Sequence, residues 1–156
     1  MPTYTYDHIH LRSRDPMSTA LYYEKMFGAE ILESTQSDGQ QRIDLDINGL
    51  VVFIARVPEG PNEPSGPSEP YIGLDHFGLL VENLDEAATE LKGLGAEFTL
   101  EPHTLRPGLK IAFVRAPDGV RIELLEREGE LEQRNQELIQ QRLQTISQLG
   151  TELGTL

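Results

Sequence analysis

The spacing of apolar and polar residues changes twice near the start of the chain, from an alternating pattern to a helical one and back. Residues 3–12 alternate and are rich in aromatic and β-branched side chains, which predicts a strand with one buried face. Asp15 and Pro16 supply an N-cap and a proline at the first helical position, and Gly28 supplies a helix end. Three further segments alternate, at 29–33, 41–46 and 50–57. The predicted element order of this part is therefore βαβββ.

The second half of the chain has the same order of patterns. Residues 71–81 have a strand pattern, Asn83 begins a segment of apolar residues at helical spacing, and Gly95 ends that segment. Strand patterns follow at 97–100, 109–114 and 120–126. The second half therefore also predicts βαβββ.

One segment of the first half has a counterpart in the second half, with an aspartate and a histidine at the same places. Residues 6–11 (YDHIHL) correspond to residues 74–79 (LDHFGL). A repeat of this kind indicates two similar units that need each other to bury a face. The sequence therefore predicts an α+β fold of two tandem βαβββ modules, at residues 1–57 and 71–127.

Two segments lie outside the repeat. Between residues 58 and 70 a proline recurs at every third position, which matches the period of polyproline II and predicts a stiff linker. Residues 128–156 are rich in Gln, Glu and Arg with a partial apolar stripe, which predicts a C-terminal amphipathic helix and tail. Such a helix suits packing against a second subunit, so we expect a homodimer.

Charge and composition narrow the classes of partner. The formal net charge of -13 repels nucleic-acid and membrane phosphates, so we expect neither as a partner and instead a small-molecule substrate. That charge gives an anionic substrate no long-range attraction, so such a substrate would need a local cation. No apolar run has the length of a membrane span and no signal peptide precedes the repeat, so we expect a cytoplasmic location.

Histidines at equivalent places in the two modules point to a metal site. The chain has 4 His and 0 Cys, so a metal would be bound by nitrogen and oxygen. His8 and His76 occupy the same position of the repeat, and Glu123 is equivalent to Phe53 in the last strand of each module. Two imidazoles and one carboxylate leave coordination positions open for water or substrate. We therefore expect one divalent metal ion, of Fe, Mn, Ni, Co or Zn, at His8, His76 and Glu123.

These motifs resemble those of the vicinal oxygen chelate superfamily, which includes glyoxalase I, extradiol dioxygenases and bleomycin resistance proteins. The resemblance covers roughly residues 5–127 and rests on the two histidine segments, on Ala116-Pro117-Asp118-Gly119 and on residues 121–125 (RIELL). It implies that the paired modules form a curved mixed sheet around a metal cleft. It also implies that His8, His76 and Glu123 are the ligands, while the fourth ligand place falls on Phe53, which cannot bind metal. That departure argues against a strict glyoxalase I.

Several neighbours of the expected ligands are candidates for catalysis or substrate binding. His10 shares a strand face with His8 and Asp44 alternates with apolar residues on its strand, so either could move a proton, although a packed histidine and a solvated carboxylate are the simpler interpretations. Phe53 would form an apolar wall and Arg121 would meet an anionic substrate group. His103 follows a proline in what we expect to be a loop, and is a third substrate-binding candidate.

Three functions are compatible with the sequence. The first is a metal-dependent lyase, isomerase or epimerase acting on a small metabolite that chelates the metal through adjacent oxygens. The second is an Fe(II)-dependent extradiol-type ring-cleaving dioxygenase, for which two His and one Glu are the expected ligands. The third is a drug-binding resistance protein without turnover. The sequence leaves open whether the two modules pair within one chain or across a dimer.

Overall fold

The computed structural model describes residues 6–35, 41–57 and 72–129, and isolated helical positions between 133 and 144. The elements follow in the order β1 (Ile9–Ser13), α1 (Pro16–Phe27), β2 (Glu30–Thr35), β3 (Gln41–Ile47), β4 (Leu50–Arg56), β5 (Phe77–Leu80), α2 (Leu84–Leu94), β6 (Glu97–Arg106), β7 (Leu109–Arg115), η1 (Pro117–Gly119) and β8 (Arg121–Arg127). The predicted linker at 58–70 lies outside the described residues, as does most of the predicted C-terminal helix and tail at 128–156.

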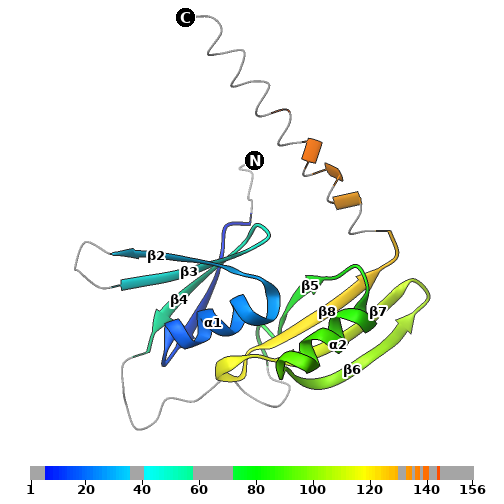
Figure 1. Cartoon of the computed structure of the whole chain (residues 1–156), viewed down its shortest axis with the longest axis horizontal. Coiled ribbons are helices and arrows are strands. Elements are labelled where there is room, and N and C mark those ends of the chain that lie inside the picture. Colours follow the sequence, from blue (N-terminus) through cyan, green and yellow to red (C-terminus); the bar gives the residue numbers. More distant parts are fainter. Residues whose placement is uncertain are drawn as a thin grey trace, which may run out of the picture.

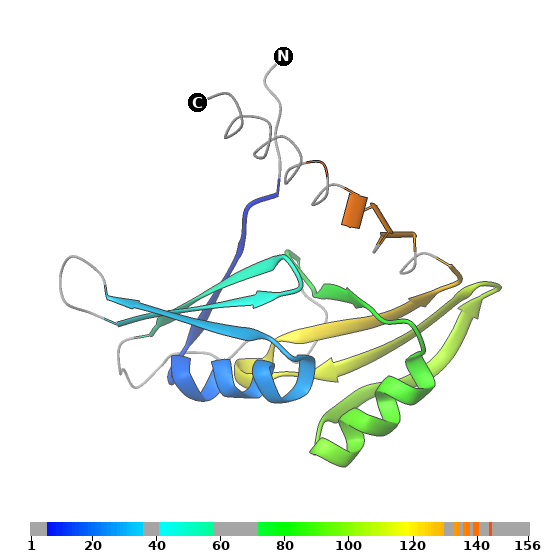
Figure 2. The same cartoon turned by 45° about the horizontal axis from the view of Figure 1, so that its top comes forward.

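The strands form two four-stranded sheets with the same topology. Their orders are β1-β4-β3-β2 and β5-β8-β7-β6. In each sheet the first strand of the module runs parallel to the last strand, and the other pairs are antiparallel. Figures 1 and 2 show the two sheets next to each other, with α1 and α2 on the same side of the molecule. The predicted α+β fold of two βαβββ modules is confirmed.

Both helices begin and end as their sequences predict. The Asp15 side chain accepts a hydrogen bond from the Ser18 amide, and Gly28 closes α1 in the left-handed conformation at φ 64. The Asn83 side chain accepts from two amides of the first turn of α2, and Gly95 closes that helix at φ 93. These capping bonds satisfy amide groups that have no partner inside the helix.

The helices cover one face of each sheet, and that face carries the core. Side chains in the middle of the strands alternate in burial, so that Val52, Leu45, Ile122 and Leu124 are all 0% exposed. They belong to one continuous apolar cluster with Ala20 and Tyr23 of α1 and the central residues of the second module. Full burial of each such side chain contributes roughly 1.5–3 kcal/mol. The neighbouring positions on each strand point to the opposite face, which is the face that carries the candidate site.

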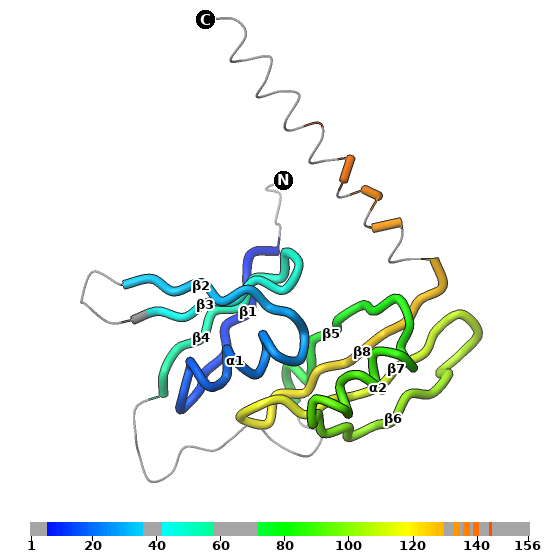
Figure 3. The backbone as a smooth tube through the Cα atoms, viewed as in Figure 1, coloured from blue at the N-terminus to red at the C-terminus, as the bar shows by residue number. Residues whose placement is uncertain are grey.

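Helix α1 joins the two modules. The Tyr22 hydroxyl donates to the carbonyl of Arg115 at 3.1 Å, and the Lys25 ammonium donates to the carbonyl of Leu94 at 2.8 Å. The tube in Figure 3 shows α1 near the turn between β7 and β8 and near α2. The contact between modules within one chain therefore runs through the helices and the core.

Among the described residues, no helix has the length and apolarity that crossing a membrane requires.

The prediction that His103 lies in a loop is wrong. Strand β6 continues to Arg106, and His103 pairs with Ile111 of β7. The strand tolerates Pro102 because β6 is the edge strand of its sheet, and register shifts on both sides of this segment relieve the pairing. Strand β5 is shorter than predicted and begins only at Phe77.

Candidate metal centre

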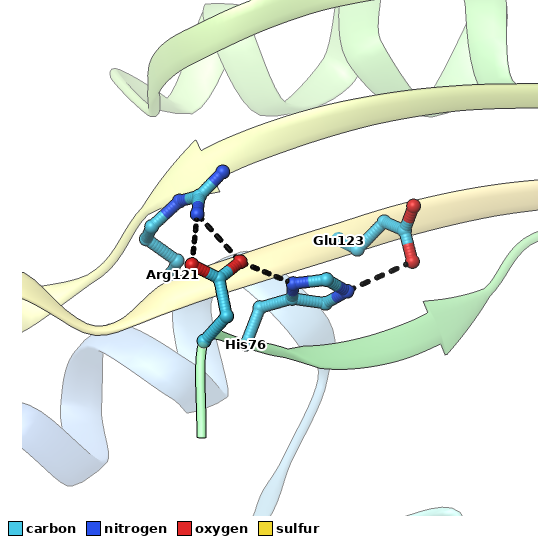
Figure 4. A network of polar contacts seen from close by, with 4 residues as sticks. His76, Arg121 and Glu123 are labelled. Carbon is cyan, nitrogen blue, oxygen red and sulfur yellow. Dashed lines mark hydrogen bonds and ion pairs between the residues drawn. The ribbon is translucent and has the colours of Figure 1, made fainter. Parts of the chain in front are cut away.

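His76 and Glu123 lie side by side on the sheet face opposite the helices. His76 precedes β5, which runs parallel to β8, and Gly78 of β5 is in register with Glu123. The imidazole Nε2 lies 3.2 Å from Glu123 Oε2. The two side chains are 31% and 17% exposed, so they are open to a ligand from one side. Figure 4 shows them pointing toward each other.

Gly78 leaves the space that this arrangement needs. A Cβ at Gly78 would lie 2.8 Å from the Leu125 side chain and 3.7 Å from Glu123 Oε2. The equivalent position of the first module is His10, whose strand partner is Phe53 rather than a carboxylate. A side chain at Gly78 would therefore collide with Leu125, whereas its Cβ would meet Glu123 Oε2 only at an ordinary contact distance.

Asp75 fixes the orientation of His76. The imidazole Nδ1 is 2.7 Å from Asp75 Oδ2, and the Arg121 guanidinium donates to both oxygens of the same carboxylate, at 2.6 and 2.5 Å. The hydrogen bond from His76, with a further contribution from the charge of Arg121, holds the pKa of Asp75 below its usual value. The ionised Asp75 carboxylate accepts a proton donated by Nδ1, which favours the tautomer in which Nε2 is an acceptor. In that tautomer Nε2 and the Glu123 carboxylate are two acceptors that face each other, and a metal ion could bind to both of them.

This chemistry fits a divalent metal. Histidine ligands commonly donate their second ring nitrogen to a carboxylate, and that bond fixes the tautomer that can bind metal. Asp75 was not among the predicted site residues. The signal that could have identified it is the aspartate that precedes the histidine in both modules. In the first module Asp7 Oδ2 contacts His8 Nδ1 in the same way. The His76 and Glu123 pair, oriented by Asp75, could supply two ligands to a metal ion.

His8 lies apart from this pair. Its ring stacks on Phe53 with 4.0 Å between centroids and an interplanar angle of 26°. Within the part of the chain that the structure describes, no group of three or more His, Asp or Glu side chains could hold a metal ion. The three expected ligands are therefore divided, with one on the first module and two on the second.

Arg121 is already engaged in the second module. Its guanidinium lies over the Phe113 ring, with Cζ 4.6 Å from the centroid, and it pairs with Asp75. Phe113 also contacts the edge of the His76 imidazole, at 5.0 Å between centroids. Arg121 therefore supports the orientation of His76. The contact with an anionic substrate that the sequence suggested stays a prediction.

The remaining candidates divide between the two modules. His10 and Asp44 flank Phe53 on neighbouring strands and line a cavity of about 750 Å³ with it. Asp44 Oδ2 accepts from Arg42 Nε at 2.6 Å, while Asp44 Oδ1 is buried with no partner among the described residues. His103 is exposed, and its Nδ1 lies 3.2 Å from the carbonyl of Glu101. The structure therefore brings His10, Asp44 and Phe53 together and places His103 apart from them, on the edge of the other sheet.

Known proteins that are similar to this chain have the same fold, and they belong to the superfamily that the sequence motifs resemble. The sequence profile of the Glyoxalase/Bleomycin resistance protein/Dioxygenase superfamily matches residues 5–124. A probable chloroplastic lactoylglutathione lyase of Arabidopsis thaliana is 38% identical over 56 residues, which are 35% of this chain and 16% of that protein. A glyoxalase family protein of Enterococcus faecalis superposes with a TM-score of 0.61 at 26% identity, over 76% of this chain and 94% of that chain.

A fosfomycin resistance protein of Listeria monocytogenes shares the fold. It superposes with a TM-score of 0.60 at 20% identity, over 81% of this chain and 95% of that chain. At this level of identity the similarity concerns the fold alone. The described chain spans a small share of the plant lyase, so that protein's activity does not transfer with the similarity.

Proposed function

The chain belongs to the Glyoxalase/Bleomycin resistance protein/Dioxygenase superfamily, and we propose that it is a divalent-metal-dependent enzyme of the lyase, isomerase or epimerase type. Its substrate is a small metabolite with two adjacent oxygen atoms. The observation that carries the proposal is the geometry of His76, whose Nδ1 bonds to Asp75 and whose Nε2 faces Glu123 at 3.2 Å. A bound divalent ion would act as a Lewis acid toward the adjacent substrate oxygens.

We infer that His8 of the partner subunit completes the ligand set. His8 lies on the open face of the first module and has no contact with His76 or Glu123 among the described residues. Among the described residues, the two modules contact each other through the helices and the core rather than through their open faces. A homodimer that places the first module of one chain against the second module of the other chain would join three ligands at each of two sites.

Asp44 is the residue that we propose as the proton acceptor. Its side chain lines the same cavity as His10, and its Oδ1 is buried and lacks a donor among the described residues. A general base needs a free lone pair, and no donor of the described residues occupies the lone pairs of this oxygen. Arg42 holds the other oxygen at 2.6 Å and so fixes the direction in which Oδ1 points. In this proposal Asp44 removes a proton from the carbon next to a chelated carbonyl, and His10, which lines the same cavity, passes that proton to solvent.

Solvent deuterium exchange tests the reaction type. The metal-loaded protein is incubated in D₂O with α-hydroxyketone, 2-oxoaldehyde hemithioacetal or methylmalonyl-thioester substrates, and exchange is followed by NMR. We expect exchange at the carbon next to the carbonyl for one of these classes, and its loss in Asp44→Asn. Asp46→Asn removes the same charge from the same strand face and serves as the matched control, because Asp46 instead bonds to the Gly49 amide. Absence of exchange with all three classes would contradict the proposal.

A ring-cleaving dioxygenase is the second candidate, and the ligand set favours it. Two histidines and one carboxylate are the set that Fe(II) oxygenases use to leave positions open for oxygen and substrate. The iron-loaded protein, prepared without oxygen, would then consume oxygen with a catechol. Oxygen uptake with catechols and no deuterium exchange would select this candidate over the first.

A further inference from the structure

We propose that Arg42 is the anion-recognising residue of the active site, and that the substrate carries a carboxylate or phosphate group some atoms away from its metal-chelating oxygens. The inference deepens the proposed function and rests on it for the position of the metal. With a formal net charge of -13, the protein as a whole repels anions, so an anionic substrate requires a local cation. On the open face of each module an arginine lies over a phenylalanine ring and bonds to a carboxylate: Arg42 in the first module and Arg121 in the second. The two arginines differ in which of their guanidinium nitrogens remain available to a ligand.

Arg42 is held in place by contacts that leave its terminal nitrogens free. Its Nε donates to Asp44 Oδ2 at 2.6 Å, and its Cζ lies 4.0 Å from the centroid of the Phe53 ring. Among the described residues, no group bonds to the two terminal nitrogens of this guanidinium, and 39% of the side chain is exposed. A guanidinium fixed at Nε and on its face presents its two terminal amino groups as a fork. That fork matches the geometry of a carboxylate or phosphate.

Arg121 also lies next to a phenylalanine and a carboxylate, but one of its two terminal nitrogens is already bonded to that carboxylate. It lies over Phe113 at 4.6 Å, as Arg42 lies over Phe53, and its terminal nitrogen NH1 bonds to both oxygens of Asp75. An incoming anion would have to displace Asp75, and Asp75 orients His76. The first module therefore offers the better anion site, although the sequence alone pointed to Arg121.

The stacking on Phe53 sets the spacing between the two ends of the substrate. Both the His8 imidazole and the Arg42 guanidinium lie 4.0 Å from the centre of this ring. Two planar groups at that distance cannot occupy the same face of one ring, so they lie on opposite faces. The Phe53 ring therefore lies between the His8 imidazole and the Arg42 guanidinium, each of which is 4.0 Å from its centre. A molecule that reaches both has its chelating oxygens at one end and its anionic group a few bonds away.

Paired probes with and without a terminal anion test the assignment. 2-Oxoglutarate and 2-oxohexanoate share the oxoacid head that chelates metal, and only the first has a terminal carboxylate. 3-Phosphonooxypyruvate and hydroxypyruvate form the corresponding phosphate pair. Binding is measured by isothermal titration calorimetry on metal-loaded and metal-free protein, for wild type, Arg42→Gln and Arg42→Lys. Arg106→Gln removes the same charge at the exposed end of β6 and is the matched control. Thermal unfolding verifies that each variant is folded.

We expect wild type to bind the member with the terminal anion about tenfold more tightly than the member without it, in at least one pair. Arg42→Gln should reduce this preference to less than twofold, Arg42→Lys should retain part of it, and Arg106→Gln should retain all of it. The pair that shows the preference identifies the anion as carboxylate or phosphate. Equal affinity for both members of each pair, no binding of any probe, or a preference that survives in Arg42→Gln would overturn the assignment.

The same titrations separate this inference from the metal site. Because the members of a pair share one head group, their difference reports the terminal anion whether or not metal is bound. A preference that depends on Arg42 in a protein that binds no metal would support the anion site and refute the metal centre. If the protein binds metal but shows no preference for the terminal anion, the metal centre is supported and the anion site is refuted.

Discussion

Replacing Asp75 with asparagine tests how the second module prepares its half of the metal centre. The Asp75 carboxylate lies 2.7 Å from His76 Nδ1, and both of its oxygens accept hydrogen bonds from Arg121. Asparagine keeps the size but removes the charge, and a charge-assisted hydrogen bond is roughly twice as strong as a neutral one. Loss of such a partner behind a ligand histidine weakens metal binding by about 10–100-fold. Since 38% of the Asp75 side chain is exposed and water can replace it in part, we expect a loss near tenfold.

Metal affinity is measured by competition with a chromophoric chelator, and the absorption of bound Co(II) reports the ligand geometry. Asp85→Asn is the matched control, because Asp85 is an exposed carboxylate whose 2.7 Å bond to Lys110 lies away from the site. We expect weakened Co(II) binding and an altered spectrum in Asp75→Asn only. Equal affinities for Asp75→Asn and wild type would refute the view that Asp75 orients the ligand, as would an equal loss in Asp85→Asn.

Three further predictions concern stability and the ligand set. Leu124→Ala removes a fully buried side chain and should lower the free energy of unfolding by about 2–5 kcal/mol in chemical denaturation; a loss below 1 kcal/mol would contradict the packing. Phe53→Glu places a carboxylate at the position equivalent to Glu123 and should tighten metal binding, whereas unchanged affinity would mean that Phe53 does not face the metal. The lowered pKa of Asp75 means that its ionised form stabilises the fold above its unfolded pKa, near 3.8, and that this contribution disappears as the pH falls through the lower folded value. The stability difference between wild type and Asp75→Asn should therefore be constant from pH 5 to 7 and shrink below pH 4; a difference independent of pH would exclude this linkage.

The fold was predictable because its signals are local. Alternation of apolar residues identifies the buried face of each strand, and Asp15, Gly28, Asn83 and Gly95 mark the helix ends through capping geometry that depends on few neighbours. The exception is the segment around His103, where a proline normally argues against a strand. An edge strand can hold a proline, and the sequence alone does not show which strand forms the edge.

The site was only partly predictable, for a different reason. The approach of His76 to Glu123 follows from the repeat, because the first and last strands of a module pair in parallel and align these positions. The pairing of Arg121 with Asp75 depends on side-chain rotamers and sheet twist, which sequence spacing does not specify. The separation of His8 from the other two expected ligands depends on how whole modules pack against each other, and local sequence patterns do not specify that packing.

The central claim is that each metal site combines His8 of one subunit with His76 and Glu123 of the other. Co-expression of His8→Ala and Glu123→Gln chains in equal amounts, followed by measurement of bound metal, tests it most directly. Random pairing makes half of the dimers mixed, and in each mixed dimer one site has both defects while the other has none. We therefore predict about one quarter of the wild-type metal content in the mixture and almost none in either variant alone. A mixture as empty as the separate variants would show that the three ligands do not meet across the dimer.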